Sequence, residues 1–196
     1  MKKAKIFFTL FLLCFSTDVY SFEKQAEDFI LKTTSTAKKI LVDSKTNELQ
    51  KRKSLEILSL ESVDVEGLAK YTLGEEIKKL NDKQISEYID TFRVFFSKNI
   101  SNKLKDYSDQ NVVISGSKKI SNNYVLVNSK IISTKDKQEI IVDWRVFLIN
   151  NKLMIRDLVV EGLSLARTQK EEFASIIANK GFEGLITSLK DFISKN

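Results

Sequence analysis

Residues 139–165 carry the clearest pattern of hydrophobic and polar positions in the chain. Apolar residues recur along both sides of Asn150-Asn151, and an Asn pair accepts the positive φ angles that a tight hairpin turn needs. Short polar separators interrupt the preceding segments in the same way. The pattern predicts four strands joined into an antiparallel meander, at residues 111–120, 123–133, 138–149 and 152–161.

Pairing outward from the Asn150-Asn151 turn assigns each strand residue to one of two faces. One face is almost wholly apolar, and the other holds more apolar groups than a solvated face needs. A turn at Asp136-Lys137, or one residue earlier, places the apolar positions of the preceding strand on the first face too, so two turns predict the same concave surface. The residues assigned to this face are Val125, Val127, Ser129, Ile131, Val142, Trp144, Val146, Leu148, Leu153, Ile155, Asp157 and Val159.

Apolar residues at helical spacing precede and follow the predicted strands. The clearest helix covers residues 82–106, where Phe92, Phe95 and Phe96 make the apolar stripe bulky. For these rings, core packing and an aromatic wall that faces a ligand are both open interpretations. Helices on both sides of an antiparallel sheet predict an α+β fold. The expected helices cover residues 23–44, 46–60, 65–73 and 82–106, with two more after Gly162 that meet at Gly181.

Capping residues mark where several of these helices begin. In two cases a Glu or Gln three residues later, Gln84 or Glu171, completes the spacing of a capping box. The second helix is expected to turn Leu49 toward the interior. The candidate N-caps are Thr46, Asp64, Asn81 and Thr168.

The first 21 residues have the pattern of a secretory signal peptide. Three lysines precede an apolar run from Ile6 to Phe15, which is too short to span a bilayer. We expect cleavage after Ser21 and a single α+β domain over residues 22–196. An uncleaved membrane anchor is the alternative.

The composition removes most catalytic and metal chemistry. The chain has no histidine, and its only cysteine, Cys14, lies in the signal segment. The mature chain therefore lacks disulfides, the commonest general base and the usual zinc ligands. P-loop, dinucleotide-binding and nucleophile-elbow motifs are absent as well. We expect no cofactor and no metal site.

The charge adds little to this picture. The formal net charge is +6, and losing the three Lys and one Asp of residues 1–21 lowers it to +4. A lysine-rich solvated surface and a weak attraction to anionic lipid both fit that value. Nucleic acid is not an expected partner. Most disulfide-free exported proteins with such a signal are bacterial, so we expect a periplasmic location.

Asp143, Asp157 and Glu161 are the candidate acid–base residues. Asp157 stands out because an isolated carboxylate on an apolar face is costly unless it is paired or protonated. A structural Asp, bonded to backbone amides or to a nearby cation, is one interpretation, and a catalytic Asp is the other. Ser164 has no neighbouring base and fits a turn or a helix start. We therefore predict no catalytic residue.

Five segments carry a resemblance to a known family. They are DVEGLAKYTLG (64–74), FRVFF (92–96), IIVDWRV (140–146), RDLVVEGLSLARTQKEEF (156–173) and GFEGLITSL (181–189). In this order and spacing they resemble the MlaC family, also called the toluene-tolerance or ABC-transporter auxiliary family, over essentially the whole mature chain. These are periplasmic phospholipid-binding proteins.

The resemblance implies a soluble carrier and not an enzyme. Such a carrier moves phospholipid, its cargo, between an inner-membrane ABC complex with an MCE protein and an outer-membrane lipoprotein–porin complex, which maintains the lipid asymmetry of the outer membrane. An enzyme that uses Asp143 or Asp157 in a cone-shaped α+β pocket, and a lipid-free periplasmic interaction module, are the alternatives. We expect an apolar lipid pocket between sheet and helices, lined by Phe92, Phe96, Val125, Val127, Val142, Trp144, Val146, Ile155 and Val159.

Overall fold

The computed structural model describes residues 21–105 and 107–196. The predicted signal peptide, apart from Ser21, lies outside the described residues. The elements are α1 (Phe22–Val42), α2 (Glu48–Ser62), α3 (Val65–Leu73), the 3₁₀ helix η1 (Gly74–Lys79), α4 (Asp82–Leu104), β1 (Gln110–Ser121), β2 (Tyr124–Ser133), β3 (Glu139–Ile149), β4 (Lys152–Val160), β5 (Leu163–Ser164) and α5 (Leu165–Lys195). The predicted α+β class is confirmed.

The strands form one antiparallel sheet in the order β1-β2-β3-β4-β5. The predicted meander is correct for its first four strands, but the sheet has five strands and not four. β5 has only two residues and pairs with Val159 and Val160 after a turn at Glu161 and Gly162, both of which have positive φ. Two residues are too few to show an alternating pattern, which is why the sequence did not reveal this strand.

Two predicted N-caps are displaced, and one is confirmed with its box. Asn47, and not Thr46, caps α2 and forms a capping box with Gln50. Asn81 caps α4 through the predicted box with Gln84. Ser164, and not Thr168, caps α5, because the chain passes directly from β5 into the helix.

Two further helix predictions have different outcomes. Leu49 is 76% exposed, so its assignment to the interior is wrong. Gly181 has φ 70° and ψ 178° and breaks α5 at the position where two helices were expected to meet.

Ser21 caps α1 by accepting a hydrogen bond from the Lys24 amide. Cleavage after Ser21 would remove this cap, at a typical cost of about 1 kcal/mol.

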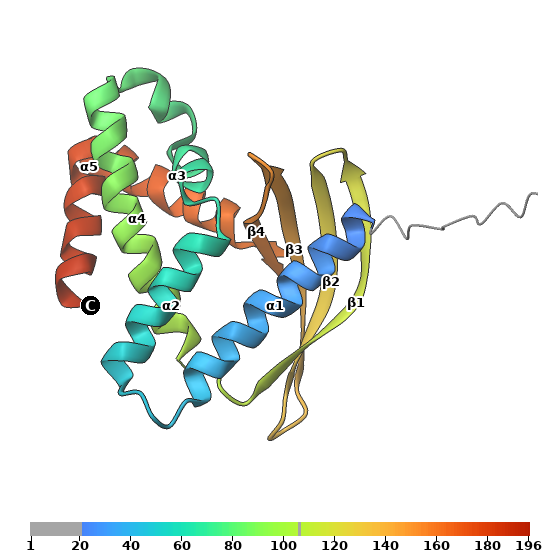
Figure 1. Cartoon of the computed structure of the whole chain (residues 1–196). Helices are drawn as coiled ribbons and strands as arrows, with labels where there is room; N and C mark the ends of the chain where they lie inside the picture. The colour runs from blue at the N-terminus through green and yellow to red at the C-terminus, as the bar shows by residue number, and fades with distance from the viewer. Residues whose placement is uncertain (1–20, 106) are drawn as a thin grey trace, which may run out of the picture.

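The helices lie in two places relative to the sheet. α1 crosses one face of the sheet over β1 and β2, whereas α2, α3, α4 and most of α5 gather beside the β4 edge (Figure 1). Each group has its own buried core. A sheet cluster joins α1 to the strands, and an aromatic cluster fills the space among α3, α4 and α5. Val63, between α2 and α3, packs against both clusters.

A buried hydroxyl pair lies inside the aromatic cluster. The Thr72 hydroxyl donates to the Ala69 carbonyl at 2.8 Å and lies 2.7 Å from the Tyr88 hydroxyl. Because the single Thr72 proton is used by Ala69, the Tyr88 hydroxyl acts as the donor to Thr72. Burial raises the pKa of Tyr88 and keeps it neutral.

This geometry predicts unequal effects of removing either hydroxyl. Tyr88→Phe leaves Thr72 bonded to Ala69 and should cost about 1 kcal/mol of unfolding free energy. Thr72→Val leaves the buried Tyr88 hydroxyl without its acceptor and should lower the free energy of unfolding by more, about 1–3 kcal/mol. Urea unfolding measures both. Equal losses, or a larger loss for Tyr88→Phe, would show that the donor assignment is wrong.

Candidate functional site

One face of the sheet, called the inner face here, is apolar and buried. Its buried members are six of the predicted lining residues: Val125, Val127, Val142, Trp144, Val146 and Ile155. None of them is more than 8% exposed. Val125 pairs with Val146, and Val127 pairs with Trp144, which is the alternation predicted from the Asp136-Lys137 turn. Ala26 and Ile30 of α1 cover the face and are fully buried.

A β-bulge between β3 and β4 changes which residues of β4 reach the inner face. Arg145 lies opposite Asp157, whereas the next β3 residue, Val146, lies opposite Ile155, so Arg156 is the extra residue. Beyond the bulge the alternation reverses. Leu158 and Val160 pack against the inner-face cluster.

The assignment of Asp157 and Val159 to the apolar face is therefore wrong. Val159 pairs with Asp143 on the opposite, outer face of the sheet. Alternation counted from the hairpin turn fails past a one-residue insertion, because the insertion shifts every later residue to the other face.

Phe92 and Phe96 are not brought together with the inner face. Phe92 is 1% exposed, and its ring lies 6.0 Å from the Phe96 ring and 6.1 Å from the Phe173 ring, centroid to centroid. Both residues belong to the aromatic cluster of the helices. Of the two interpretations of this stripe, core packing describes the observed structure.

The inner face contains polar pairs that are satisfied, among them Ser117 with Glu27 of α1 at 2.7 Å and Trp144 with Ser129. The Trp144 indole N–H donates to the Ser129 hydroxyl at 2.8 Å, and Ser129 donates to the Val142 carbonyl at 2.9 Å. The two bonds fix the orientation of the indole ring. The alternating pattern placed Ser129 on this face but gave no sign of its partner.

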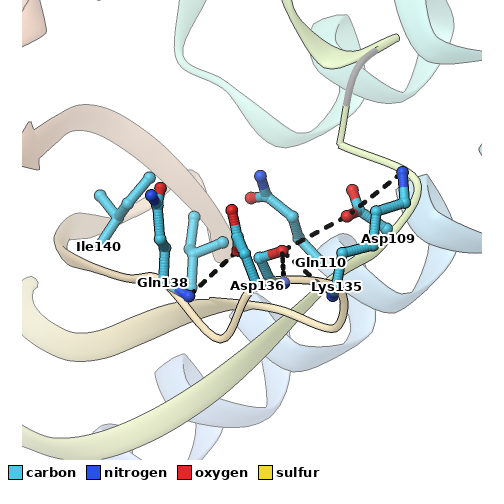
Figure 2. Close-up of a pocket in the computed structure, with 8 residues that line it drawn as sticks. Asp109, Gln110, Lys135, Asp136, Gln138 and Ile140 are labelled. Atoms are coloured by element: carbon cyan, nitrogen blue, oxygen red, sulfur yellow. Dashed lines mark hydrogen bonds and ion pairs between the residues drawn. The ribbon is translucent and has the colours of Figure 1, made fainter.

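A polar-rimmed cavity of about 280 Å³ lies beside the end of the inner face, near the β2–β3 turn (Figure 2). Ile131 and Ile140, which pair across β2 and β3, form its apolar side and pack against the inner-face cluster. Gln110 contributes a side-chain oxygen that is buried and has no hydrogen-bond partner among the described residues. The remaining rim residues are Asp109, Ser133, Lys135, Asp136 and Gln138.

The rim of this cavity carries both signs of charge. The Lys135 ammonium lies 3.6 Å from the Asp109 carboxylate. A hydrogen bond from Ser133, followed by one from the Gln138 amide, holds the pKa of Asp136 below its usual range. Asp136 is therefore ionised at neutral pH. The cavity thus combines one apolar side, formed by Ile131 and Ile140, with a charged, water-exposed edge.

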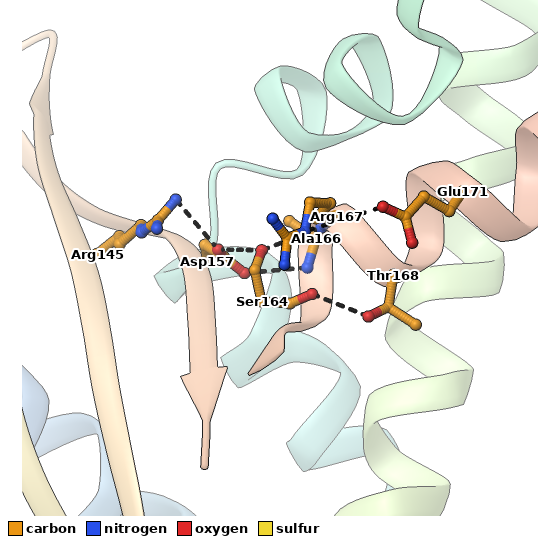
Figure 3. Close-up of polar contacts among 7 residues, drawn as sticks. All are labelled: Arg145, Asp157, Ser164, Ala166, Arg167, Thr168 and Glu171. Carbon is orange, nitrogen blue, oxygen red and sulfur yellow. Dashed lines mark hydrogen bonds and ion pairs between the residues drawn. The ribbon is translucent and has the colours of Figure 1, made fainter. Parts of the chain in front are cut away.

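Asp157 joins the sheet to the start of α5 (Figure 3). Its carboxylate accepts a hydrogen bond from the Ser164 hydroxyl at 2.6 Å and one from the Ala166 amide at 2.9 Å. Arg145 adds an ion pair at 3.5 Å. Both carboxylate oxygens are engaged, which is the structural arrangement predicted as one interpretation, and Ser164 serves as the helix start.

The described part of the chain shows neither a metal cluster nor a membrane-spanning helix. Asp143 accepts a hydrogen bond from the Asn128 amide at 2.7 Å on the outer face. Across residues 21–105 and 107–196, no three Asp, Glu, His or Cys side chains gather as a metal site. Within the same ranges, no helix is both long enough and apolar enough to cross a membrane.

The Trp144–Ser129 bond gives a stability prediction for the inner face. Ser129→Ala leaves the buried indole N–H without its acceptor and should lower the free energy of unfolding by about 1–3 kcal/mol. Adding Trp144→Phe to Ser129→Ala removes the stranded donor, so the double variant should lose less than the sum of the single losses. Denaturant unfolding of Ser129→Ala, Trp144→Phe and the double variant measures this coupling, and strict additivity of the losses would contradict it.

Comparison with known proteins identifies the family. A family model described as MlaC protein matches residues 31–191. No curated protein matches the sequence. Among solved structures, the fold is similar to that of a phospholipid-binding protein from Ralstonia solanacearum in complex with a phospholipid, with a TM-score of 0.73, 18% identity, and coverage of 87% of this chain and 97% of that chain. The family match spans most of the sequence, and the chain belongs to the MlaC family.

Proposed function

We propose that this protein binds phospholipid and carries it through the periplasm, with the acyl chains held between the inner face and α1. The observation that carries the proposal is the buried apolar inner face, whose flanking residues Ile131 and Ile140 also line the polar-rimmed cavity. Membership of the MlaC family supports it. So does the fold shared with a protein that was solved with a phospholipid bound.

The energy of acyl chains in water sets what the protein must do. A phospholipid has roughly 30 acyl CH₂ groups, and each costs about 0.8 kcal/mol in water, which gives on the order of 24 kcal/mol. A carrier must hide nearly all of this surface. Its affinity for phospholipid has only to match that of the bilayer, because much tighter binding would prevent delivery.

The inner face must open to accept this cargo. The cavity at its end has about 280 Å³, near the lower limit of ordinary ligand pockets, which span about 300–1,000 Å³. α1 rests on the sheet through the buried Ala26 and Ile30, through Phe22 and Phe29, and through a hydrogen bond from the Ser117 hydroxyl to the Glu27 carboxylate at 2.7 Å. Re-exposing the larger apolar side chains costs up to about 1.5–3 kcal/mol each, which is less than acyl burial provides. We infer that α1 moves away from the sheet when lipid enters.

The polar rim is the proposed place for the lipid headgroup. Lys135, Asp109 and Asp136 supply both signs of charge at the water-exposed edge. A mixed rim accepts zwitterionic and anionic headgroups without strong selection. The buried Gln110 oxygen offers one acceptor to a headgroup donor.

The finer role is part of the same proposal. We propose that the protein exchanges phospholipid with an inner-membrane ABC complex that carries an MCE protein, and with an outer-membrane lipoprotein–porin complex. Family membership and the signal pattern of residues 1–21 support this role. The exchange maintains the asymmetry of the outer membrane and needs no chemistry in this chain, since ATP is hydrolysed by the ABC complex.

The test is to purify the processed protein without detergent, and to measure bound lipid by native mass spectrometry and solvent extraction. The proposal predicts stoichiometric phospholipid. Repeated preparations of folded protein without lipid would overturn it and would favour the lipid-free interaction module.

A bulky substitution on the inner face should lower the amount of lipid bound. Val127→Trp fills space that acyl chains would take, and overpacking of about 1–3 kcal/mol should lower occupancy several-fold while the protein stays folded. Val113→Trp is the matched control, because Val113 lies on the outer face of β1 and is 48% exposed. Equal occupancy in both variants would show that the inner face does not hold the lipid.

A further inference from the structure

A second cavity lies on the other side of the sheet. It has a volume of about 370 Å³ and is formed between the outer face of β3 and β4 and the helix α3. Leu68, Tyr71 and Phe147 provide its apolar wall, and Arg145, Arg156 and Asp157 provide its charged groups. The proposed lipid site uses none of these residues.

Arg145 has spare hydrogen-bonding capacity. Its side chain is 46% exposed, and its guanidinium makes one ion pair, at 3.5 Å to Asp157, and no hydrogen bond within the described structure. Asp157 is already engaged by Ser164 and Ala166 (Figure 3). Most of the five guanidinium N–H donors are therefore left for water or a ligand.

The second arginine is held rigidly beside the first. The Arg156 Nε–H donates to the Asp64 carboxylate at 2.6 Å, and the guanidinium lies 4.7 Å from the centre of the Phe147 ring. The Phe147 ring in turn stacks on Tyr124, with centroids 4.4 Å apart. This stacking fixes an aromatic surface next to the cations.

The charged side chains that line the cavity do not cancel. Arg145 and Arg156 are positive and Asp157 is negative, which leaves the lining with one net positive charge. Next to the lining, Lys170 lies 5.1 Å from the centre of the Tyr71 ring, and Asp64 pairs with Arg156 at 2.6 Å. The lining therefore matches a ligand with a single negative charge.

We propose that this cavity binds a singly charged oxyanion, a carboxylate or a phosphodiester, that is joined to an apolar group. The free edge of Arg145 presents parallel N–H donors that match two oxygens of such an anion. The apolar group packs against Leu68, Tyr71 and Phe147. The volume of about 370 Å³ suits a small ligand or one end of a larger one.

The experiment uses the processed protein labelled with ¹⁵N and three probes. 4-Phenylbutyrate carries a carboxylate on an apolar arm, 4-phenylbutanol is its neutral analogue, and dihexanoylphosphatidylglycerol below its micelle concentration carries a phosphodiester. The proposal predicts amide shifts around Tyr71, Arg145 and Phe147 with at least one anionic probe, and weaker shifts with the alcohol. A response to phenylbutyrate identifies a carboxylate source, and a response to the lipid alone identifies a headgroup.

Variants at Arg145 separate specific hydrogen bonding to the ligand from non-specific electrostatic attraction. Arg145→Gln should weaken binding of the anionic probe about tenfold or more, since a hydrogen bond to a charged group is lost. Arg145→Lys keeps the charge, loses the paired donors, and should give an intermediate affinity. Lys118→Gln removes an exposed cation from the outer face of β1 and should leave the affinity unchanged.

Three results would overturn this assignment. They are no shift around Arg145 with either anionic probe, equal binding of the neutral alcohol, or unchanged affinity in both Arg145 variants. Shifts confined to Val127 and Val142 would place the lipid probe on the inner face and would also count against the outer cavity. The first three results do not depend on whether the inner face carries lipid.

Discussion

The need to keep the inner sheet face out of water governs this structure. Val125, Val127 and Val146 are completely buried, although α1 alone of the described helices lies across the face. α1 covers it from the side of β1 and β2, and Val63 packs against it from the side of the helical group. Val63 also forms a bridge with Ile155, and the next amide, that of Asp64, donates to the Ile155 carbonyl at 2.9 Å. The cover therefore consists of two separate pieces, one of which is a single helix.

The bulge at Arg156 determines how the two faces of β4 are used. Without the extra residue, Asp157 would be directed into the apolar inner face, where an unpaired carboxylate is costly. With it, Leu158 and Val160 take the inner positions, and Asp157 lies opposite Arg145 on the outer face. The same insertion brings Arg145, Arg156 and Asp157 together. A single irregularity thus completes the apolar face and also creates the charged cavity behind it.

The sequence predicted the features that depend on turns and periodicity. Asn150 and Asn151 have the positive φ values expected of their turn. The faces predicted for β2 and β3 agree with the observed pairing, which is centred one residue before Asp136-Lys137. The sequence did not reveal the bulge, because no glycine marks it. Val159, which follows the bulge, was therefore assigned to the wrong face. Phe92 shows a different limit, because the periodicity of a buried helix is the same whether its aromatic stripe faces a core or a ligand. Ser164 capped α5 in place of Thr168 through contacts with Asp157, which is seven residues away and beyond any local capping pattern.

The most direct measurement is photo-crosslinking with a phospholipid that carries a photoreactive group in an acyl chain. The labelled lipid is loaded into the folded protein, and the crosslinked peptides are then mapped by mass spectrometry. Our account predicts crosslinks to the inner-face segments around Val127 and Val142 and to α1 around Ile30. Crosslinks confined to the aromatic cluster around Phe92, or to the outer face around Phe147, would contradict it.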